Sequence, residues 1–441
     1  MKLLFILPEY VREPVGGIRT FYCDLLPALA RSGCLVKVLL ARREFAGAES
    51  FTDEVGVEVE YVRADLLQKH DAIFQDSQFA GNWLLGQFMP VASAAFEQTS
   101  GGVGFDLVEL TDWPLIFLPW VAQAEAFTPY TISLHSSVGQ MVEYEPLGEN
   151  RLDYTLVRLF EASGFAAAPS LHANSNLNAR YWERITNRKV DVLLPYLANR
   201  TFTRDGRSVF SELERVSSAK PRGAVFARFQ NLKGAWILAS ALMEVPNVEV
   251  HWYGADMFNL EKGCLWSESL KGDYPNLMGD KLIYHKPLRP DDVQEHMAKA
   301  DFVCVPSLWD VFNLSAIEAM SQGCVVICSQ QAGAEMLIEN EVNGFTFDAQ
   351  KPSDLADKIR QAISLTSSEK SKMGNAARLT IQDRLNPKTI LEERLRYYKQ
   401  TADNHRPRNN NPFLPEILSL KRTRKMTPGR LFYKARKALG F

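Results

Sequence analysis

The chain has 441 residues with a formal net charge of −2, and 46% of its residues are hydrophobic and 23% charged. This composition is typical of a globular protein of two or three domains, and the near-neutral charge argues against a nucleic-acid-binding protein. The N-terminal apolar run ends at Pro8, too early for a signal-peptide core, and no other run is long enough to span a bilayer. Six scattered cysteines without metal spacing favour a reduced, cytoplasmic protein.

Short, continuously apolar runs alternate with longer amphipathic segments along the first half of the chain. The runs are rich in β-branched and aromatic residues and are bounded by turn residues, which predicts buried strands. Helices are expected between them at Thr20–Ser32 and Tyr154–Ala167. The predicted strands are Lys2–Leu7, Leu35–Leu40, Val57–Val62, Phe105–Leu110, Thr131–His135 and Val190–Leu194.

The pattern resets after residues 199–221, which are polar and lack a strand-like run. A second series of predicted strands follows, again with helical segments between them: Gly223–Arg228, Val248–Tyr253, Lys281–His285, Phe302–Val305, Cys324–Cys328 and Gly344–Phe347. Strand–helix alternation indicates parallel sheets covered by helices on both faces. We therefore expect an α/β protein of two doubly wound, Rossmann-like domains, residues 1–200 and 201–385, with a cleft between them.

Polar residues follow several of these predicted strands, where open parallel sheets bind their ligands. Taken singly, each has a plain structural explanation, such as a turn, a satisfied core histidine or a solvated charge. Together, two cations and a helix start near Asn313 indicate a ligand that carries phosphate. The strand-end residues are Gly16, Gly17, His135, Arg228, Lys233, Gly254 and Asp310, with Glu318 in the helix that follows Asp310.

The stretch PSLWDVFNLSAIEAMSQGCVVIC, residues 306–328, resembles a known family signature. It is similar to that of the large family of retaining glycosyltransferases with the GT-B fold, which includes sucrose and glycogen synthases and bacterial group 1, family 4-like transferases. The resemblance is strong in the second half of the chain and loose in the first. Four flanking pieces agree with it: VFARFQNLKGA, QQAGAEMLIENEVNGFTF, PEYVREPVGGIRTFYCDLLPALARSG and ISLHSS.

The resemblance implies a role for each matching residue. Asp310 would contact hydroxyls of the donor sugar, and Glu318 would accept from the ribose hydroxyls, since a carboxylate suits a vicinal diol. Arg228 and Lys233 would bind the diphosphate, and His135 would lie beside the donor sugar. The further donor-binding positions are the glycines Gly16, Gly17 and Gly254 and the backbone amides of Phe312, Asn313 and Leu314 at a helix N-terminus.

Three positions depart from the family pattern. Asp310 stands where the family usually has Glu, Asn313 where it has Gly, and Ala227 where a Gly precedes the arginine. The shorter arm of Asp310 moves the carboxylate back, and Asn313 adopts a positive φ less freely than Gly, although better than most residues. These departures bear on the identity of the donor more than on the reaction.

The resemblance implies transfer of a sugar from a nucleotide diphosphate sugar to an acceptor hydroxyl with retention at the anomeric carbon. The chain contains no D-x-D motif, so a bound metal is not indicated, and no cofactor is expected. Glycan, lipid-linked and small-molecule acceptors all remain open. The alternatives are a sugar-nucleotide epimerase or phosphorylase on the same scaffold, and a degenerate, non-catalytic sugar-nucleotide-binding protein. A dehydrogenase is disfavoured because no G-x-G-x-x-G follows either first strand.

The last segment of the chain is basic. A helix at residues 386–404 is expected to cross back to the N-terminal domain, and a tail of residues 405–441 follows it. Residues 418–441 contain many Lys and Arg and neither Asp nor Glu, with one apolar stripe at helical spacing. Two roles fit this tail: docking of the stripe on the N-terminal domain, or peripheral contact with an anionic membrane, which would place the enzyme at the inner face of the membrane.

Overall fold

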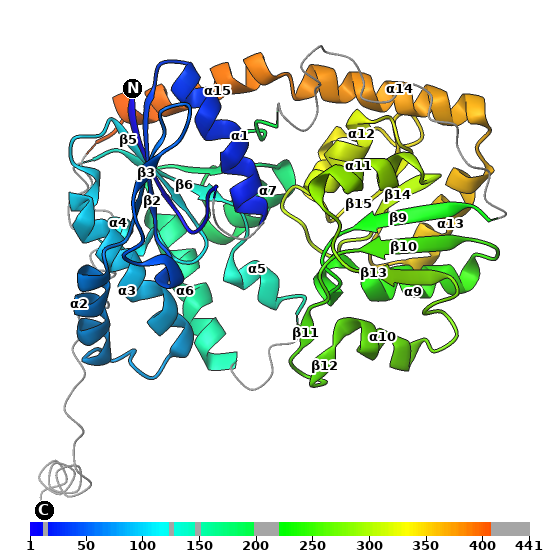
Figure 1. The fold of residues 1–441 in the computed structure, drawn as a ribbon, viewed down its shortest axis with the longest axis horizontal. Coiled ribbons are helices and arrows are strands. Elements are labelled where there is room, and N and C mark those ends of the chain that lie inside the picture. Colours follow the sequence, from blue (N-terminus) through cyan, green and yellow to red (C-terminus); the bar gives the residue numbers. More distant parts are fainter. Residues whose placement is uncertain (12–15, 123–127, 146–150, 198–219, 407–441) are drawn as a thin grey trace, which may run out of the picture.

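The computed structural model describes residues 1–11, 16–122, 128–145, 151–197 and 220–406. It contains two α/β domains side by side, each built on one sheet with helices on both faces (Figure 1). The predicted architecture of two doubly wound, largely parallel sheets is therefore confirmed. Most of the polar segment 199–221 and the tail from residue 407 onward lie outside the described residues.

The N-terminal sheet has eight strands in the order β3-β4-β2-β1-β5-β6-β7-β8. Its strands pair in parallel except β3, which runs antiparallel to β4. The central strands are buried, as expected for a sheet covered on both faces. The strands are β1 Lys2–Leu7, β2 Leu35–Leu40, β3 Phe51–Thr52, β4 Glu58–Tyr61, β5 Leu107–Thr111, β6 Tyr130–Leu134, β7 Leu171–Ala173 and β8 Asp191–Val192.

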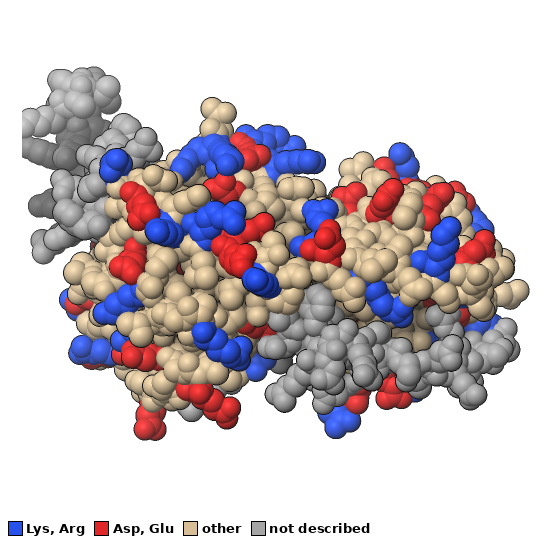
Figure 2. Space-filling model, turned by 90° about the horizontal axis from the view of Figure 1, so that it is seen from above, with Lys and Arg blue, Asp and Glu red and all other residues tan. Residues whose placement is uncertain are grey.

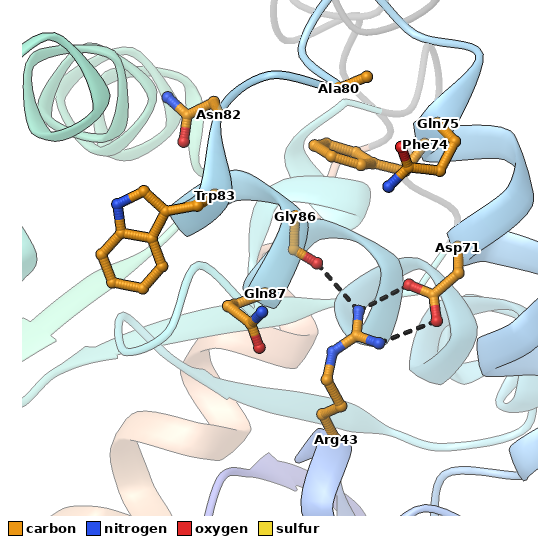
Figure 3. Close-up of a pocket in the computed structure, with 9 residues that line it drawn as sticks. All are labelled: Arg43, Asp71, Phe74, Gln75, Ala80, Asn82, Trp83, Gly86 and Gln87. Atoms are coloured by element: carbon orange, nitrogen blue, oxygen red, sulfur yellow. Dashed lines mark hydrogen bonds and ion pairs between the residues drawn. The ribbon is translucent and has the colours of Figure 1, made fainter. Parts of the chain in front are cut away.

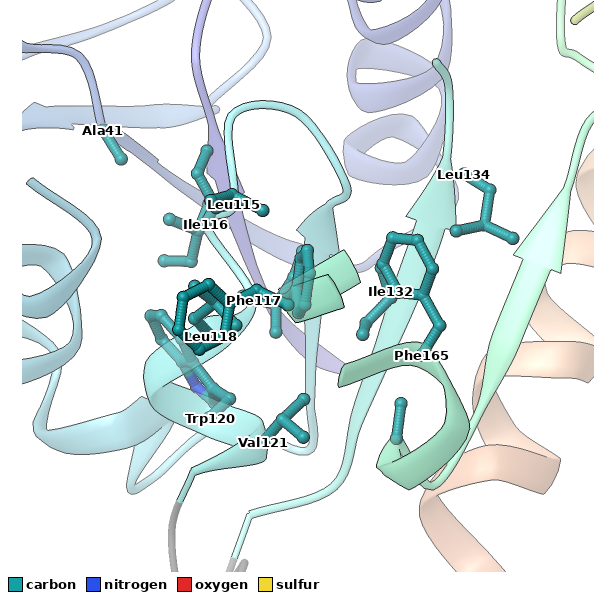
Figure 4. Close-up of a cluster of buried hydrophobic side chains, with 14 of the residues drawn as sticks. Ala41, Leu115, Ile116, Phe117, Leu118, Trp120, Val121, Ile132, Leu134 and Phe165 are labelled. Carbon is teal, nitrogen blue, oxygen red and sulfur yellow. The ribbon is translucent and has the colours of Figure 1, made fainter. Parts of the chain in front are cut away.

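Alternate residues of β1 enter two different cores. Leu3 and Phe5 pack on the face that is covered by helix α1, whereas Leu4 and Ile6 face helices α2 to α7. Figure 4 shows part of the second core, where Phe117, Trp120 and Phe165 pack beside strand β6. The helices are α1 Gly17–Arg31, α2 Ala64–Gln75, α3 Trp83–Gln98, α4 Leu118–Val121, α5 Val138–Val142, α6 Arg151–Ala167 and α7 Asn176–Thr186.

The C-terminal sheet has six parallel strands in the order β13-β10-β9-β14-β15-β16, and a small antiparallel hairpin pairs β11 with β12. Its two faces also carry separate cores, one beneath α9 and α13 and the other beneath α11, α12 and α14. The strands are β9 Arg222–Phe226, β10 Glu249–Tyr253, β11 Phe258–Asn259, β12 Cys264–Leu265, β13 Leu282–His285, β14 Phe302–Val305, β15 Val326–Ser329 and β16 Phe345–Phe347.

The helices of this domain are followed by a helix that returns to the N-terminal sheet. Helix α15 runs along the top of Figure 1 after α14, and its Tyr397 and Tyr398 join the core beneath α1. Helix α15 therefore packs on the N-terminal domain although it follows the C-terminal domain in the chain. The helices are α9 Ala235–Glu244, α10 Trp266–Asp273, α11 Pro290–Ala298, α12 Leu314–Ser321, α13 Pro352–Ser364, α14 Ser367–Arg384 and α15 Pro387–Asp403.

The bounds predicted from the sequence agree best for long apolar runs. The expected bounds of β1, β2 and β14 are those of the structure, and the other predicted strands differ from it by one or two residues at one or both ends. The prediction missed β3, β7 and the hairpin of β11 and β12. These strands have only two or three residues, too few to show a period.

The segment after α5 and helix α7 of the N-terminal domain touch the loops that follow β9 and β14 of the C-terminal domain. The Asn231 side chain donates to the Tyr144 carbonyl at 2.6 Å, and the Leu232 amide donates to the Glu145 carboxylate at 2.6 Å. The rings of Tyr181 and Trp309 lie 5.2 Å apart across the same boundary. This interdomain contact involves the edge of each sheet at which doubly wound folds bind ligands.

Charges of both signs are interspersed over the face seen in Figure 2. This mixture agrees with the small net charge. Within the described residues, every helix is too short or too polar to span a bilayer.

Candidate functional site

Lys233 and Asp310 form an ion pair beyond the carboxyl ends of β9 and β14. Lys233 ends the short 3-10 helix Asn231–Lys233. Its Nζ lies 2.7 Å from Asp310 Oδ2, and the two side chains are 16% and 10% exposed. Burial by itself would raise the pKa of Asp310, but Lys233 and the Asn313 amide outweigh it and hold that pKa below its usual value. The pair therefore places an ionised carboxylate beside an ammonium in a largely desolvated position.

Asn313 joins this pair to the start of α12. Its backbone has a positive φ of 62°, the conformation expected at this position because the family that the sequence resembles usually has glycine there. Its Oδ1 accepts from the Ala316 amide at 2.9 Å and caps the helix, while its Nδ2 donates to Asp310 Oδ2 at 2.8 Å. Asp310 and Asn313, two of the departures from the family pattern, are thus bonded to each other.

The other predicted residues of this segment lie on or next to α12. The Phe312 side chain is 3% exposed and belongs to the core, and its backbone helps to hold the pKa of Asp310 low. Leu314 is the first residue of α12, and Glu318 follows about one turn later, half-buried. Only the backbone of Phe312, and not its ring, is therefore directed to the Asp310 side of the segment.

A carboxylate of the N-terminal domain approaches the predicted cations. Arg228 is exposed, two residues after the end of β9. Burial raises the pKa of Glu145 above its usual value, although the Leu232 amide and the charges of Arg228 and Lys233 oppose the rise. Arg228 and Lys233 thus both lie near this carboxylate of the other domain.

His135 follows β6 in the N-terminal domain and is 6% exposed. Its Nε2 lies 3.0 Å from Ser133 Oγ and 3.2 Å from the Tyr22 hydroxyl, and its ring packs on Phe21 at 5.0 Å. Burial lowers the pKa of His135 to about 3, with Arg394 adding to the shift. The imidazole is therefore neutral at physiological pH and can exchange hydrogen bonds without carrying a charge.

Two buried carboxylates hold the backbone that follows His135. Asp112 accepts from the amides of His135 and Ser136, each at 3.0 Å. Glu161 accepts from Val138 and Gly139 at the start of α5, at 2.7 and 2.8 Å. Burial raises the pKa of Asp112 to about 7 and that of Glu161 to about 8.

Sequence reasoning missed these two acids and Glu145. Asp112 lies two residues after the predicted strand Phe105–Leu110 and could have been noticed on that ground. Glu145 follows no predicted strand, and Glu161 lies within the predicted helix Tyr154–Ala167, so neither carried a signal of its own.

Two of the predicted glycines have a local structural reason. A Cβ at Gly16 would lie 2.3 Å from Glu9 Oε1, and a Cβ at Gly254 would lie 1.8 Å from the Ala227 carbonyl oxygen. Gly17, the first residue of α1, has no atom within 4 Å of such a Cβ among the described residues. Among the described residues, a side chain at Gly17 would therefore meet no neighbour, unlike one at Gly16.

The structure brings Lys233, Asp310 and Asn313 into direct contact. Arg228 lies close enough to act on the same carboxylate as Lys233. His135, Gly16 and Gly17 belong to the other domain.

A separate pocket lies between α2 and α3, on the side of the N-terminal domain turned away from the C-terminal domain (Figures 1 and 3). Its floor is a bidentate ion pair of Arg43 with Asp71 at 2.6 and 2.8 Å, and Arg43 also donates to the Gly86 carbonyl at 2.9 Å. These contacts tie the segment after β2 to the two helices. The pocket contains none of the residues predicted from the sequence.

Comparison with known families agrees with this arrangement. Residues 16–196 match the glycosyl transferase 4-like domain, and residues 268–380 match the glycosyl transferases group 1. The matches fall on the two domains in the order that the sequence motifs suggested. The chain belongs to the group 1 glycosyltransferases.

Curated relatives of this glycosyltransferase include D-inositol 3-phosphate glycosyltransferases. The protein from Mycolicibacterium smegmatis is 23% identical over 355 residues, which is 79% of each chain. That from Xylanimonas cellulosilytica is 23% identical over 357 residues, covering 78% of this chain and 82% of the relative. Both alignments span both domains.

Solved structures show the GT-B fold that the resemblance implied. Sucrose-phosphate synthase from Thermosynechococcus elongatus superposes with a TM-score of 0.70 at 18% identity, covering 92% of this glycosyltransferase and all of that chain. Anabaena HepE in complex with UDP-glucose superposes with a TM-score of 0.64 at 18% identity, covering 91% and 100%. At these identities the likeness concerns the fold.

Proposed function

We propose that this glycosyltransferase moves a sugar from a nucleotide diphosphate sugar to an acceptor hydroxyl, with retention at the anomeric carbon and without a metal ion. The observation that carries the proposal is the desolvated Lys233–Asp310 pair beside the N-terminus of α12. A similar fold binds UDP-glucose in HepE, which supports a nucleotide sugar as the donor.

The donor would bind across the carboxyl ends of β9 and β14. Glu318 on α12 would accept from the two ribose hydroxyls, while the amides at the start of the helix face the diphosphate. Asp310 would accept from sugar hydroxyls, with Lys233 and Asn313 keeping it ionised. The bonded pair of Asp310 and Asn313 therefore presents a different set of groups from the family's usual Glu and Gly, which supports a distinct choice of donor sugar.

The developing charge on the leaving diphosphate would be stabilised by Lys233 and Arg228. Preorganised cations in a site of low solvent access can supply this stabilisation because they need little rearrangement during the reaction. The leaving phosphate oxygen would take the proton of the acceptor hydroxyl while the new bond forms on the same face of the sugar. This step needs no nucleophile from the protein, no divalent metal and no cofactor.

The acceptor would bind on the N-terminal domain, near neutral His135 and Gly17 at the start of α1. The similarity to D-inositol 3-phosphate glycosyltransferases supports a polyhydroxylated acceptor, as a small molecule, glycan or lipid-linked sugar. We place the reaction in polysaccharide or glycoconjugate synthesis in the cytoplasm. The basic tail, which lies outside the described residues, would add contact with an anionic membrane surface.

The test begins with a thermal-shift panel of UDP-, GDP-, ADP- and TDP-sugars. A ligand at 100 times its Kd raises the stability by about 2.7 kcal/mol, so the true donor should stand out. Release of the nucleoside diphosphate and the anomeric configuration of the product, read by NMR, then test transfer and retention. An inverted product would overturn retention, and conversion of the donor without an acceptor would favour an epimerase.

A further inference from the structure

A chain of buried polar groups leads from His135 to the returning helix α15. Glu109, on β5, is 1% exposed. It accepts from the Tyr22 hydroxyl at 2.7 Å and from the Tyr398 hydroxyl at 2.6 Å. Arg394 of α15 places Nη1 3.9 Å from the same carboxylate, and it is also 1% exposed. A carboxylate and a guanidinium are thus buried together immediately behind His135.

The donor and the acceptor of each hydrogen bond in this row of buried side chains can be assigned by counting the hydroxyl and imidazole protons. The Tyr22 hydroxyl has one proton, and its hydrogen bond to Glu109 at 2.7 Å uses it. The Tyr22 oxygen can therefore only accept from its other hydrogen-bond partner, which is His135 Nε2 at 3.2 Å.

Only one protonation of the imidazole satisfies all of these atoms. If Nε2 were bare, its lone pair would face the lone pairs of the Tyr22 oxygen at 3.2 Å, and no hydrogen bond could form between them. If Nε2 carries the proton, it donates to the Tyr22 oxygen, with Ser133 Oγ as a second acceptor at 3.0 Å, and Tyr22 donates to Glu109. Unpaired polar atoms in a buried site are costly, so the second arrangement is favoured.

We propose that Glu109 and Tyr22 are positioning residues that hold His135 in its Nε2–H tautomer, so that Nδ1 keeps its lone pair and accepts a hydrogen bond from a hydroxyl of the sugar substrate. A carboxylate that orients a histidine through its second nitrogen is a recurring way to fix a tautomer. The contact of His135 with the sugar rests on the proposed function. The tautomer itself is a property of the protein alone.

Helix α15 completes this arrangement. Tyr398 and Arg394 approach Glu109 from a segment 285 to 289 residues away in the chain, after the C-terminal domain. Arg394 Nη1 also donates to His172 Nε2 at 2.9 Å, and its guanidinium lies 5.4 Å from the Phe21 ring that covers His135. The returning helix therefore supplies the second hydroxyl and the cation that pair with Glu109, while Tyr22 links Glu109 to His135.

The experiment uses the full chain labelled with ¹⁵N-histidine, whose imidazole nitrogens report the tautomer by NMR. The His135 signals are assigned by their loss in His135→Gln. We expect the Nε2–H form in the parent. Tyr22→Phe removes the Tyr22 oxygen that accepts from Nε2 and leaves Ser133, which can donate to a bare Nε2, so the fraction of the Nδ1–H form should rise.

The matched control is Tyr397→Phe. Tyr397 is a buried tyrosine of α15 whose hydroxyl bonds Thr131 and Ser170 at 2.7 and 2.6 Å instead of Glu109. The same chemical change there should leave the His135 tautomer as it is in the parent. The proposal would be overturned if His135 of the parent were in the Nδ1–H form, or if both variants changed the tautomer equally. The spectrum of the parent tests the proposal even if Tyr22→Phe does not fold.

Transfer kinetics separate this inference from the proposed function. With the donor identified by the thermal-shift panel, Tyr22→Phe should lower kcat about 10-fold, as is usual for loss of an orienting partner, with little change in the Kd for the nucleoside diphosphate. His135→Gln could transfer sugar at the parental rate while the parent and Tyr22→Phe show the expected tautomers. That result would overturn the contact of His135 with the sugar and leave the positioning of His135 by Tyr22 and Glu109 intact. Equal losses of kcat in Tyr22→Phe and Tyr397→Phe would indicate a general loss of packing and would overturn the positioning role.

Discussion

Replacing Lys233 with methionine removes the ammonium and retains most of the apolar length of the side chain. A charge-assisted hydrogen bond to phosphate contributes roughly 1.5–3 kcal/mol. Lys233 already bonds Asp310 at 2.7 Å, so part of the energy gained from the phosphate replaces that bond. We therefore expect a loss of about 2 kcal/mol, which raises the Kd for the nucleoside diphosphate about 30-fold.

Isothermal titration calorimetry measures this Kd directly, with the nucleotide that the thermal-shift panel selects. Lys262→Met is the matched control, because Lys262 also pairs with an aspartate of the same domain, Asp273 at 3.1 Å, but is 47% exposed. Exposed pairs contribute little, so Lys262→Met should leave the Kd within about twofold of the parent. A Kd for Lys233→Met as close to the parent as that of the control would refute the assignment of Lys233 to the diphosphate.

Four further outcomes are expected. Asp310→Glu should retain transfer but change the preferred donor sugar, because the arm is longer by one methylene; an inactive variant that binds nucleotide normally would show that the pocket excludes the longer arm. EDTA should leave the rate within about twofold, since Lys233 and Arg228 neutralise the diphosphate; a collapse restored by Mg²⁺ or Mn²⁺ would contradict this. The lowered pKa of Asp310 means that its pairing stabilises the fold above the unfolded value of about 3.9 and that this contribution is lost as the pH falls through the folded value. The difference in melting temperature between the parent and Asp310→Asn should therefore narrow below about pH 4, and a constant difference down to about pH 3 would argue against the ion pair. Finally, a chain that ends at Asn411 should lose co-sedimentation with phosphatidylglycerol vesicles at low salt; equal pelleting of both chains, or none of the full chain, would remove the membrane from the proposal.

The sequence by itself determined the architecture and one half of the candidate site. Buried parallel strands are continuous apolar runs, so β1, β2 and β14 could be bounded without a structure. Lys233, Asp310 and Asn313 were found because they follow such runs and because their spacing matches a family signature. Their position in the sequence is enough to predict that they lie together, since all three belong to loops that follow neighbouring strands of one sheet.

The surroundings of His135 were decided by the tertiary structure. Glu109 reads in the sequence as a charge that interrupts an apolar strand, and nothing near it predicts that Tyr22, Tyr398 and Arg394 will meet it. Likewise, the sequence placed Glu145 and Lys233 in different domains, and only the interdomain contact brings the carboxylate to the cations. Hydrophobic periodicity reports which face of an element is buried, but the pairing of buried polar groups depends on which elements pack together. That pairing is set when helix α15 returns to the first sheet and when the loops of the two domains meet.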